Sequence, residues 1–420
     1  MTNRGGKLLA VVLLGFLGNL FLSNEAPAAD AANWPAWRGP HGNGHGDGQA
    51  VPLRWDKSQN VLWKAEVPGR GHSSPVVFGD RIFLTTADEG AKTQSILAYD
   101  RRRGDQIWQT IAHRDGFMRN HQKNSHASAT PACDGERVYS VFINGTGLHV
   151  TATDLDGNIV WQREAGKFVS EHGYGSSPVL YESVVIVNGE SLEKSFITAL
   201  DRETGETVWR TPTKTTGNHG GFGTPIVRRL AGKDQLLLMG IENTSSYNPR
   251  DGKPIWTCKG PAEVNAGTVV THGDLVIASG GYPEKEILGI RADGTGDVTE
   301  SHVVWRKSNG MTYVPTALVN DGHLFIVNDQ GVASCLDVAS GRRIWQERLR
   351  GNFSASPTLA AGYLFVPNEA GMTYVLRASS AFDVVAENDL GDGGFATPSI
   401  CDSQIFLRTN HALYCIAERN

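Results

Sequence analysis

Five of the 13 histidines fall in loops that lead into short Ser-Ser-Pro, Ala-Thr-Pro or Gly-Thr-Pro stretches. They are His72 (GHSSP), His121 and His126 (the loop ending HASATP), His172 (HGYGSSP) and His219 (HGGFGTP). Imidazoles that converge can bind a transition metal or carry protons in hydrolysis or redox chemistry. No H-E-x-x-H motif supports a zinc hydrolase. The alternative is that each histidine separately hydrogen-bonds a neighbouring strand.

A second group of side chains offers hard oxygen ligands of the kind that Ca²⁺ prefers. These are Asn188 and Glu190 in IVNGES, Glu242 and Asn243 in MGIENTS, and Asn328 and Asp329 in IVNDQG. Each group follows an apolar run, so we expect it at the end of a strand. The alternative is that these are ordinary polar loop tips.

Aromatic residues accompany the histidines, three or four positions before the apolar runs: Tyr174, Phe222, Tyr313, Phe353 and Phe395. Such a collar could contact a planar ligand or a partner peptide. It could equally fill the mouth of a narrowing channel.

The strands that must position these side chains belong to a sequence unit that repeats along the chain. The stretch ALDRETGETVW (199–209) recurs as AYDRRRGDQIW, ATDLDGNIVW, YNPRDGKPIW and CLDVASGRRIW. Eight units begin with a signature such as SSPVVFGDRIFL, and each reads as four short strands separated by turns. The chain ends after a third strand, and VLWKAEV around Trp63 supplies the missing fourth. The sequence therefore predicts an all-β, eight-bladed β-propeller whose N-terminal strand closes the last blade.

One tryptophan ends most of these units: Trp63, Trp108, Trp161, Trp209, Trp256, Trp305 and Trp345. We assign these residues to docking between adjacent blades, each packed against the glycine of a neighbouring turn. The seventh unit, RASSAFDVVAEN, lacks the tryptophan and is predicted to be degenerate.

The N-terminus has the layout of a secretory signal peptide. Arg4 and Lys7 precede an apolar core, and Ala26 and Ala28 form an A-x-A site, which predicts cleavage near residue 28. The predicted organisation is a signal peptide at 1–28, a segment at 29–55 that braces the outside of the propeller, and the propeller at 56–420. After cleavage no membrane span remains, so we expect an exported monomer.

The amino-acid composition limits the kinds of partner that we expect. A net charge of −5 and the absence of a basic run argue against nucleic acid. The five cysteines form no C-x-x-C motif, which excludes a zinc ribbon and a covalently attached c-type haem, and we expect them to be buried free thiols.

The units follow the pattern [AC]-x-D-x-x-[TS]-G-x-x-x-W and resemble the pyrroloquinoline-quinone (PQQ) repeat family of eight-bladed propellers over roughly residues 55–420. NWPAWRGPHGNGHGDG (33–48) is similar to the W-P-x-W-R-G-P-x-G opening of exported members common in planctomycete-type bacteria. The resemblance implies one of two functions: a quinoprotein dehydrogenase, or a scaffold like the propeller lipoprotein of the outer-membrane β-barrel assembly machinery.

The resemblance implies that, in the dehydrogenases, PQQ lies between a tryptophan and a vicinal disulfide and that Glu, Asn and Asp hold Ca²⁺. This sequence has no Cys-Cys pair, and the tryptophans inside the blades are assigned to docking. We therefore predict a periplasmic or extracellular scaffold whose loop face binds a protein or cell-envelope partner. The alternative is a PQQ- and Ca²⁺-dependent dehydrogenase, or a metal-dependent enzyme, that uses the histidine-rich face.

Overall fold

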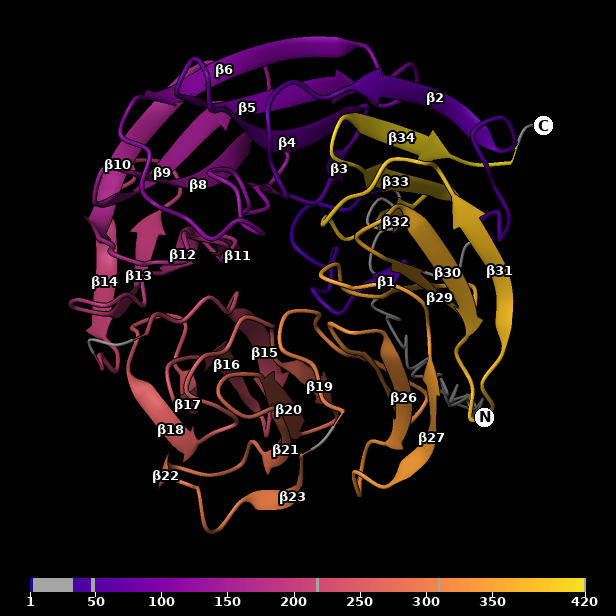
Figure 1. The fold of residues 1–420 in the computed structure, drawn as a ribbon. Coiled ribbons are helices and arrows are strands. Elements are labelled where there is room, and N and C mark those ends of the chain that lie inside the picture. Colours follow the sequence, from indigo (N-terminus) through magenta and orange to yellow (C-terminus); the bar gives the residue numbers. More distant parts are fainter. Residues whose placement is uncertain (3–32, 47–49, 217–218, 309, 419–420) are drawn as a thin grey trace.

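Eight sheets, each built on four antiparallel strands, stand in a ring around a common axis (Figure 1). The computed structural model describes residues 1–2, 33–46, 50–216, 219–308 and 310–418. No helix occurs among these residues. The eight-bladed propeller predicted from the repeats is confirmed.

Each blade runs from an innermost strand to an outermost strand. Blades 1 to 4 comprise β3 (Val76–Phe78), β4 (Arg81–Asp88), β5 (Thr93–Asp100) and β6 (Gln106–Arg114); β7 (Ala132–Cys133), β8 (Arg137–Asn144), β9 (Gly147–Asp154) and β10 (Ile159–Lys167); β11 (Val179–Tyr181), β12 (Val184–Asn188), β13 (Phe196–Asp201) and β14 (Thr207–Pro212); and β15 (Ile226–Leu230), β16 (Lys233–Met239), β17 (Asn243–Tyr247) and β18 (Pro254–Lys259), with β22 (Gly296–Asp297) added outside.

Blades 5 to 8 comprise β19 (Val270–His272), β20 (Leu275–Gly280), β21 (Glu286–Arg291) and β23 (Val303–Ser308); β24 (Leu318–Asn320), β25 (His323–Val327), β26 (Val332–Asp337) and β27 (Arg343–Arg348); β28 (Thr358–Ala360), β29 (Tyr363–Pro367), β30 (Met372–Arg377) and β31 (Val384–Asp389), with β1 (His45–Gly46) added inside; and β32 (Ser399–Cys401), β33 (Gln404–Arg408), β34 (Ala412–Ile416) and β2 (Val61–Glu66).

The burial of the strands differs with their position in the blade. The second and third strands are buried along nearly their whole length, as in VVIVN of β12 and FITALD of β13, because both faces pack against neighbouring blades. The outermost strand β14 alternates, with Trp209 buried and Val208 exposed. The core is therefore the set of interfaces between blades.

The N-terminal strand closes the ring. β2 pairs antiparallel with β34, with Trp63 opposite Cys415 and Glu66 opposite Ala412. On the inner side, the backbone N–H of Thr397 in blade 8 donates to the Ser74 hydroxyl in blade 1, at 3.1 Å. The closure predicted from VLWKAEV is confirmed. The N-terminal strand completes the last blade, and hydrogen bonds join the last blade to the first.

The tryptophans of the repeat lie in the outermost strands. Six of the seven donate their indole N–H to a backbone carbonyl in the turn of the next blade: Trp63, Trp108, Trp161, Trp209, Trp305 and Trp345. Five of these rings cover a glycine with positive φ, at Gly104, Gly157, Gly205, Gly252 and Gly341. Trp256 differs, because its N–H donates to Gln235 in its own blade. In the degenerate seventh unit, Phe382 takes the place of the glycine against Trp345.

Residues 33–46 of the N-terminal segment lie inside the ring. Trp34 exchanges two backbone hydrogen bonds with Val77 of the innermost strand β3, and Pro35 accepts the N–H of Cys133 in β7. At its other end, β1 pairs in parallel with β28. The expectation that the segment braces the outside is wrong for residues 33–46, because their backbone finds its partners on the short inner strands. Residues 53–55 do contact an outermost strand: Arg54 and Leu53 O hydrogen-bond Val385 and Asn388 of β31.

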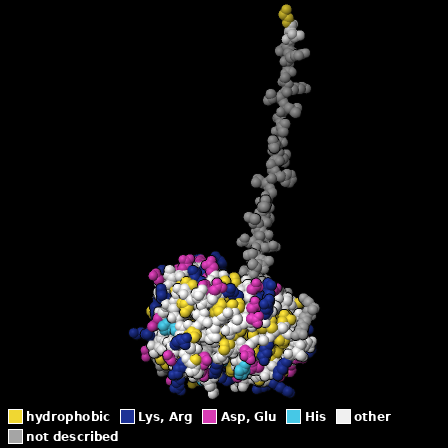
Figure 2. All heavy atoms as spheres, turned by 90° about the horizontal axis from the view of Figure 1, so that it is seen from above, with side chains coloured by type: hydrophobic (Ala, Val, Ile, Leu, Met, Phe, Trp, Pro, Cys, Tyr) yellow, Lys and Arg dark blue, Asp and Glu magenta, His cyan; other side chains and the backbone are white. Residues whose placement is uncertain are grey.

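Residues 3–28 of the predicted signal peptide lie outside the described residues. In the described part of the chain, no helix is long and apolar enough to cross a membrane. On the side of the molecule seen in Figure 2, basic and acidic side chains are interspersed.

Candidate functional site

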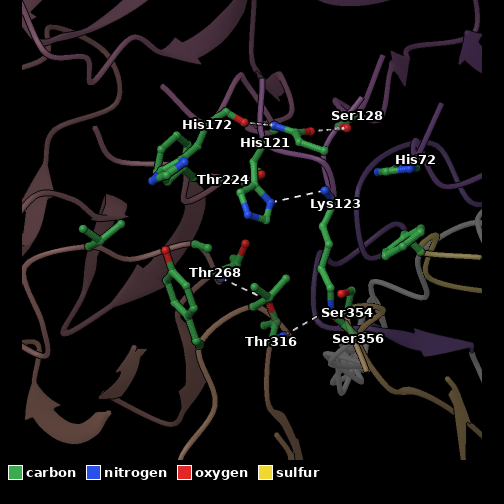
Figure 3. Close-up of a pocket in the computed structure, with 18 of the residues that line it drawn as sticks. His72, His121, Lys123, Ser128, His172, Thr224, Thr268, Thr316, Ser354 and Ser356 are labelled. Carbon is green, nitrogen blue, oxygen red and sulfur yellow. Dashed lines mark hydrogen bonds between the residues drawn. The ribbon is translucent and has the colours of Figure 1, made fainter. Parts of the chain in front are cut away.

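A cavity of about 770 Å³ opens where the loops before the innermost strands converge. We call it the funnel. It narrows from a mouth lined by His172, His219 and Tyr282 to a floor made of hydroxyl groups and the indole of Trp37. Figure 3 shows His72, His121 and His172 around the space, with the hydroxyl residues Thr224, Thr268, Thr316 and Ser356.

The floor is a ring of one serine or threonine from each blade. Its members are Ser74, Thr130, Ser177, Thr224, Thr268, Thr316, Ser356 and Thr397. Seven of the eight hydroxyl oxygens accept the backbone N–H of the preceding ring member, at 2.9–3.1 Å. The eighth, Thr268 Oγ1, accepts the indole N–H of Trp37 at 3.1 Å. Because these oxygens act as acceptors, their O–H groups are the donors that remain for a ligand.

Trp37 makes the funnel blind. It belongs to the N-terminal segment, which enters the ring from the opposite end, and it lines both the funnel and a second cavity beyond it. The segment brings Trp37 up through the centre of the ring.

Four of the five predicted histidines line the funnel: His72, His121, His172 and His219. The rings of His121 and His172 meet edge to face at 5.7 Å between centroids. His126 does not reach the funnel. Its ring stacks on Phe117 at 4.1 Å, behind the loop.

The environment keeps two of these imidazoles neutral. Burial lowers the pKa of His72 to about 3, with help from the charges of Arg408 and Arg70. Partial burial, and then His121, lower the pKa of His172. His121 Nδ1 accepts the N–H of Lys123 at 3.2 Å, which places the proton of the neutral ring on Nε2.

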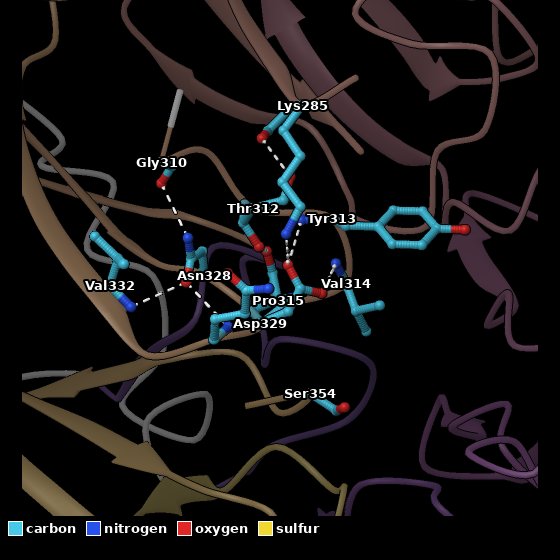
Figure 4. Close-up of polar contacts among 12 residues, drawn as sticks. Lys285, Gly310, Thr312, Tyr313, Val314, Pro315, Asn328, Asp329, Val332 and Ser354 are labelled. Carbon is cyan, nitrogen blue, oxygen red and sulfur yellow. Dashed lines mark hydrogen bonds and ion pairs between the residues drawn. The ribbon is translucent and has the colours of Figure 1, made fainter. Parts of the chain in front are cut away.

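Two of the three acidic groups that line the funnel, Glu369 and Asp329, are held by partners within the protein, and the third is Glu171. Lys123 Nζ lies 2.9 Å from both carboxylate oxygens of Glu369. Asp329 accepts Lys285 Nζ at 2.8 Å and the backbone N–H groups of Tyr313 and Val314 (Figure 4). These carboxylates fix the rim loops in place.

Most of the predicted oxygen ligands lie elsewhere. Glu190 is 1% exposed and packs beneath the loops, and burial raises the pKa of its carboxyl group to about 8. Glu242 pairs with Lys214, outside the funnel. Asn243 Oδ1 accepts the hydroxyl of Ser245.

The two remaining asparagines are also engaged. Asn188 donates to Gly223 O and accepts the N–H of Glu190. Asn328 donates to Gly310 O and accepts two backbone N–H groups, an arrangement that shapes its own loop (Figure 4). Of the oxygen ligands predicted from the sequence, only Asp329 lines the funnel.

Four of the five aromatic residues predicted to form a collar line the funnel: Phe222, Tyr313, Phe353 and Phe395. Phe395 stacks on His72 at 4.5 Å. Tyr174 is buried instead, edge to face against Phe168.

Sequence reasoning missed several funnel residues. The Ser/Thr-Pro signature was visible as the start of each blade, but only the ring shows that its hydroxyls meet. Lys123, Glu369 and Tyr282 carry no repeated pattern, so nothing in the sequence marks them.

The described residues do not fit the PQQ and Ca²⁺ site that the fold family implies. All five cysteines are buried and free, so no disulfide forms a wall. Glu190 is sealed beneath the loops, and Asn188 and Asn243 make hydrogen bonds within the protein. Within the described ranges, no three or more His, Cys, Asp or Glu side chains are arranged to hold a metal ion.

The fold and the site define an eight-bladed propeller with a blind funnel at its loop face. A family model described as "Outer membrane protein assembly factor BamB" matches residues 46–110, 92–301 and 297–382. The chain therefore belongs to this family of PQQ-like repeat propellers.

Solved structures agree on the fold. BamB from Moraxella catarrhalis is 14% identical with a TM-score of 0.62, covering 86% of this chain and 98% of that chain. Quinohemoprotein alcohol dehydrogenase from Comamonas testosteroni is 13% identical with a TM-score of 0.67, covering 94% and 82%. No curated protein matches the sequence. The planctomycete-type origin stays a prediction.

Proposed function

We propose that the protein is an exported, non-catalytic binding protein whose funnel holds a peptide segment of a protein partner. The observation that carries this proposal is a deep, blind cavity with apolar residues exposed at its mouth and O–H donors at its floor. Tyr282 and Val314 are 52% and 38% exposed there. Large side chains left exposed on a concave surface are typical of binding sites.

The chemistry of the funnel favours binding over catalysis. Of the three carboxylates that line the funnel, those of Glu369 and Asp329 are neutralised by Lys123 and Lys285, and His72 is neutral. A general base or nucleophile needs a free reactive atom with a matched pKa. A peptide needs what the funnel offers, namely donors for its carbonyl oxygens and rings for its side chains.

Export is part of the proposal. It is supported by the signal-peptide layout of residues 1–28 and by the family description, which names outer membrane assembly. The proposal does not require a quinone, whose ligand set the described residues lack.

The test is selection of peptides from a random display library on the immobilised protein, followed by titration of the enriched peptides. We expect Val314→Asn to weaken binding by about threefold or more, because it removes apolar contact at the mouth. Val208→Asn is the matched control, since Val208 is 53% exposed on the outermost strand β14, away from the funnel. It should bind as the wild type does.

A titration with PQQ, with and without Ca²⁺, separates the two branches of the family. We expect no saturable binding in either condition. Saturable PQQ binding that Ca²⁺ strengthens, or enriched peptides that bind the Val314→Asn and Val208→Asn variants equally, would overturn the proposal.

A further inference from the structure

A second cavity, of about 750 Å³, lies at the other end of the ring. Its walls are the far ends of the innermost strands β11, β15, β19 and β24, together with residues 35–37, residues 39–43 and His45 of the N-terminal segment. The cavity is separate from the funnel except at Trp37 and Thr224, which line both.

Arg38 is buried beside this cavity without a carboxylate. Its side chain is 1% exposed, and its Nη2 donates to the backbone carbonyls of Asn43 and Ala317. Among the described residues, its Nε and Nη1 have no hydrogen-bond partner. Burial, and then the nearby charge of Arg228, lower the pKa of Arg38 to about 9.

Arg228 is the second guanidinium and faces the cavity from β15. Its Nη1 donates to its own neighbour, Val227 O, at 2.8 Å. Burial lowers its pKa as well. Within the part of the chain that the structure describes, neither Arg38 nor Arg228 forms an ion pair with a carboxylate.

The glycines between the two arginines explain how the guanidiniums come together. A Cβ on Gly44 would lie 2.7 Å from Arg38 Nη2, and a Cβ on Gly42 would lie 3.4 Å from Arg228 Nη2. Both glycines have positive φ, which disfavours other residues. The loop of the R-G-P-H-G-N-G stretch is thus shaped around two positive charges.

The other charged side chains at the cavity do not neutralise the two guanidinium groups. Among the described residues that line the cavity, Asp321 is the one carboxylate, and its Oδ2 accepts Asn320 Nδ2. A guanidinium that is buried without a compensating charge is unfavourable, and Arg38 is fully buried beside the partly buried Arg228. An anion at this position would remove that penalty.

We propose that this cavity binds a small oxyanion, held directly by Arg228 and attracted by the charge of Arg38 behind it. The free Nε–H and Nη–H groups of a guanidinium match the paired oxygens of a phosphate, sulfate or carboxylate. Arg38 acts through its charge, because its nitrogens are closed off from the cavity. The site lies at the end of the ring opposite the funnel and does not depend on the function proposed above.

The test is titration of the purified protein with inorganic phosphate, sulfate and acetate at fixed ionic strength, with chloride as the reference ion. At least one oxyanion should bind saturably and raise the midpoint of thermal unfolding above that in chloride. The three ions distinguish tetrahedral anions from a carboxylate.

Two variants test the residue assignment. Arg228→Gln should weaken binding about tenfold or more, because it removes charged hydrogen bonds. The matched control is Arg229→Gln, since Arg229 is the next residue of β15, 70% exposed at its side chain and paired with Asp234. It should bind as the wild type does.

Arg38→Gln adds a readout that needs no ligand. Without an oxyanion this variant should unfold no earlier than the wild type, because it removes an uncompensated buried charge, and it should bind the anion more weakly. The proposal is overturned if no oxyanion differs from chloride, or if Arg229→Gln loses as much affinity as Arg228→Gln.

Discussion

Glu190 provides a sharp test of how the loops beneath the funnel are packed. Its carboxyl group is closed in by Gly221 and Gly240: a Cβ at these positions would lie 1.9 Å and 2.4 Å from the carboxylate oxygens. Its Oε2 has no hydrogen-bond partner among the described residues. Burial of this kind favours the protonated acid, and it raises the pKa of Glu190 to about 8.

The sign of the pH dependence follows from proton linkage. In the unfolded chain the pKa returns to the ordinary value of 4.5. Between pH 4.5 and 8 the folded protein holds a proton that the unfolded chain has lost, so stability falls as the pH rises through this window. A shift of about 3.5 units corresponds to a loss of up to about 5 kcal/mol at about 1.4 kcal/mol per unit.

Glu190→Gln keeps the shape and removes the titration. The two proteins should be similar in unfolding free energy near pH 5, and at pH 9 the variant should be more stable by several kcal/mol. Guanidinium unfolding at pH values from 5 to 9, followed by circular dichroism, measures the difference. The control is Glu193→Gln, an exposed residue of the same loop, which should follow the wild type. Parallel curves for the wild type and Glu190→Gln would refute the buried, protonated carboxyl.

Three further changes test other parts of the structure. Gly252→Ala places a methyl group 2.4 Å from the Trp209 ring, whereas Gly232 has a similar φ and open space around it. Guanidinium unfolding should show Gly252→Ala to be less stable than Gly232→Ala by about 1–3 kcal/mol. Equal losses of stability would count against blade docking by this tryptophan. Trp37→Phe removes the hydrogen bond to the Thr268 hydroxyl and should lower the unfolding free energy by about 1 kcal/mol, measured in the same way. His72→Gln should make the protein less sensitive to acid: because the pKa of His72 is lowered to about 3, the wild type loses stability as the pH falls from 6.5 toward 3, and acid titration followed by circular dichroism should show a lower midpoint for the variant.

The candidate site was predicted in part. The histidine positions relative to the Ser/Thr-Pro signature placed His72, His121, His172 and His219 at one mouth, because equivalent loops of a closed ring emerge on the same face. The same reasoning failed for His126, which has Phe117 available to stack on. Two residues in one loop can face opposite ways, and the spacing alone does not say which residue faces inward.

The sequence by itself determined the architecture. Strand alternation, turn residues and the recurring tryptophan are local patterns, and their number and the incomplete last unit fix eight blades closed by the N-terminal strand.

Only the tertiary structure decided the environment of individual side chains. Trp37 became the floor of the funnel, Glu190 was sealed beneath the loops, and Arg38 came to lie beside Arg228. In each case the deciding neighbours come from other blades or from the far end of the chain. The charge and solvent exposure of a side chain depend on these distant neighbours, which no local pattern records.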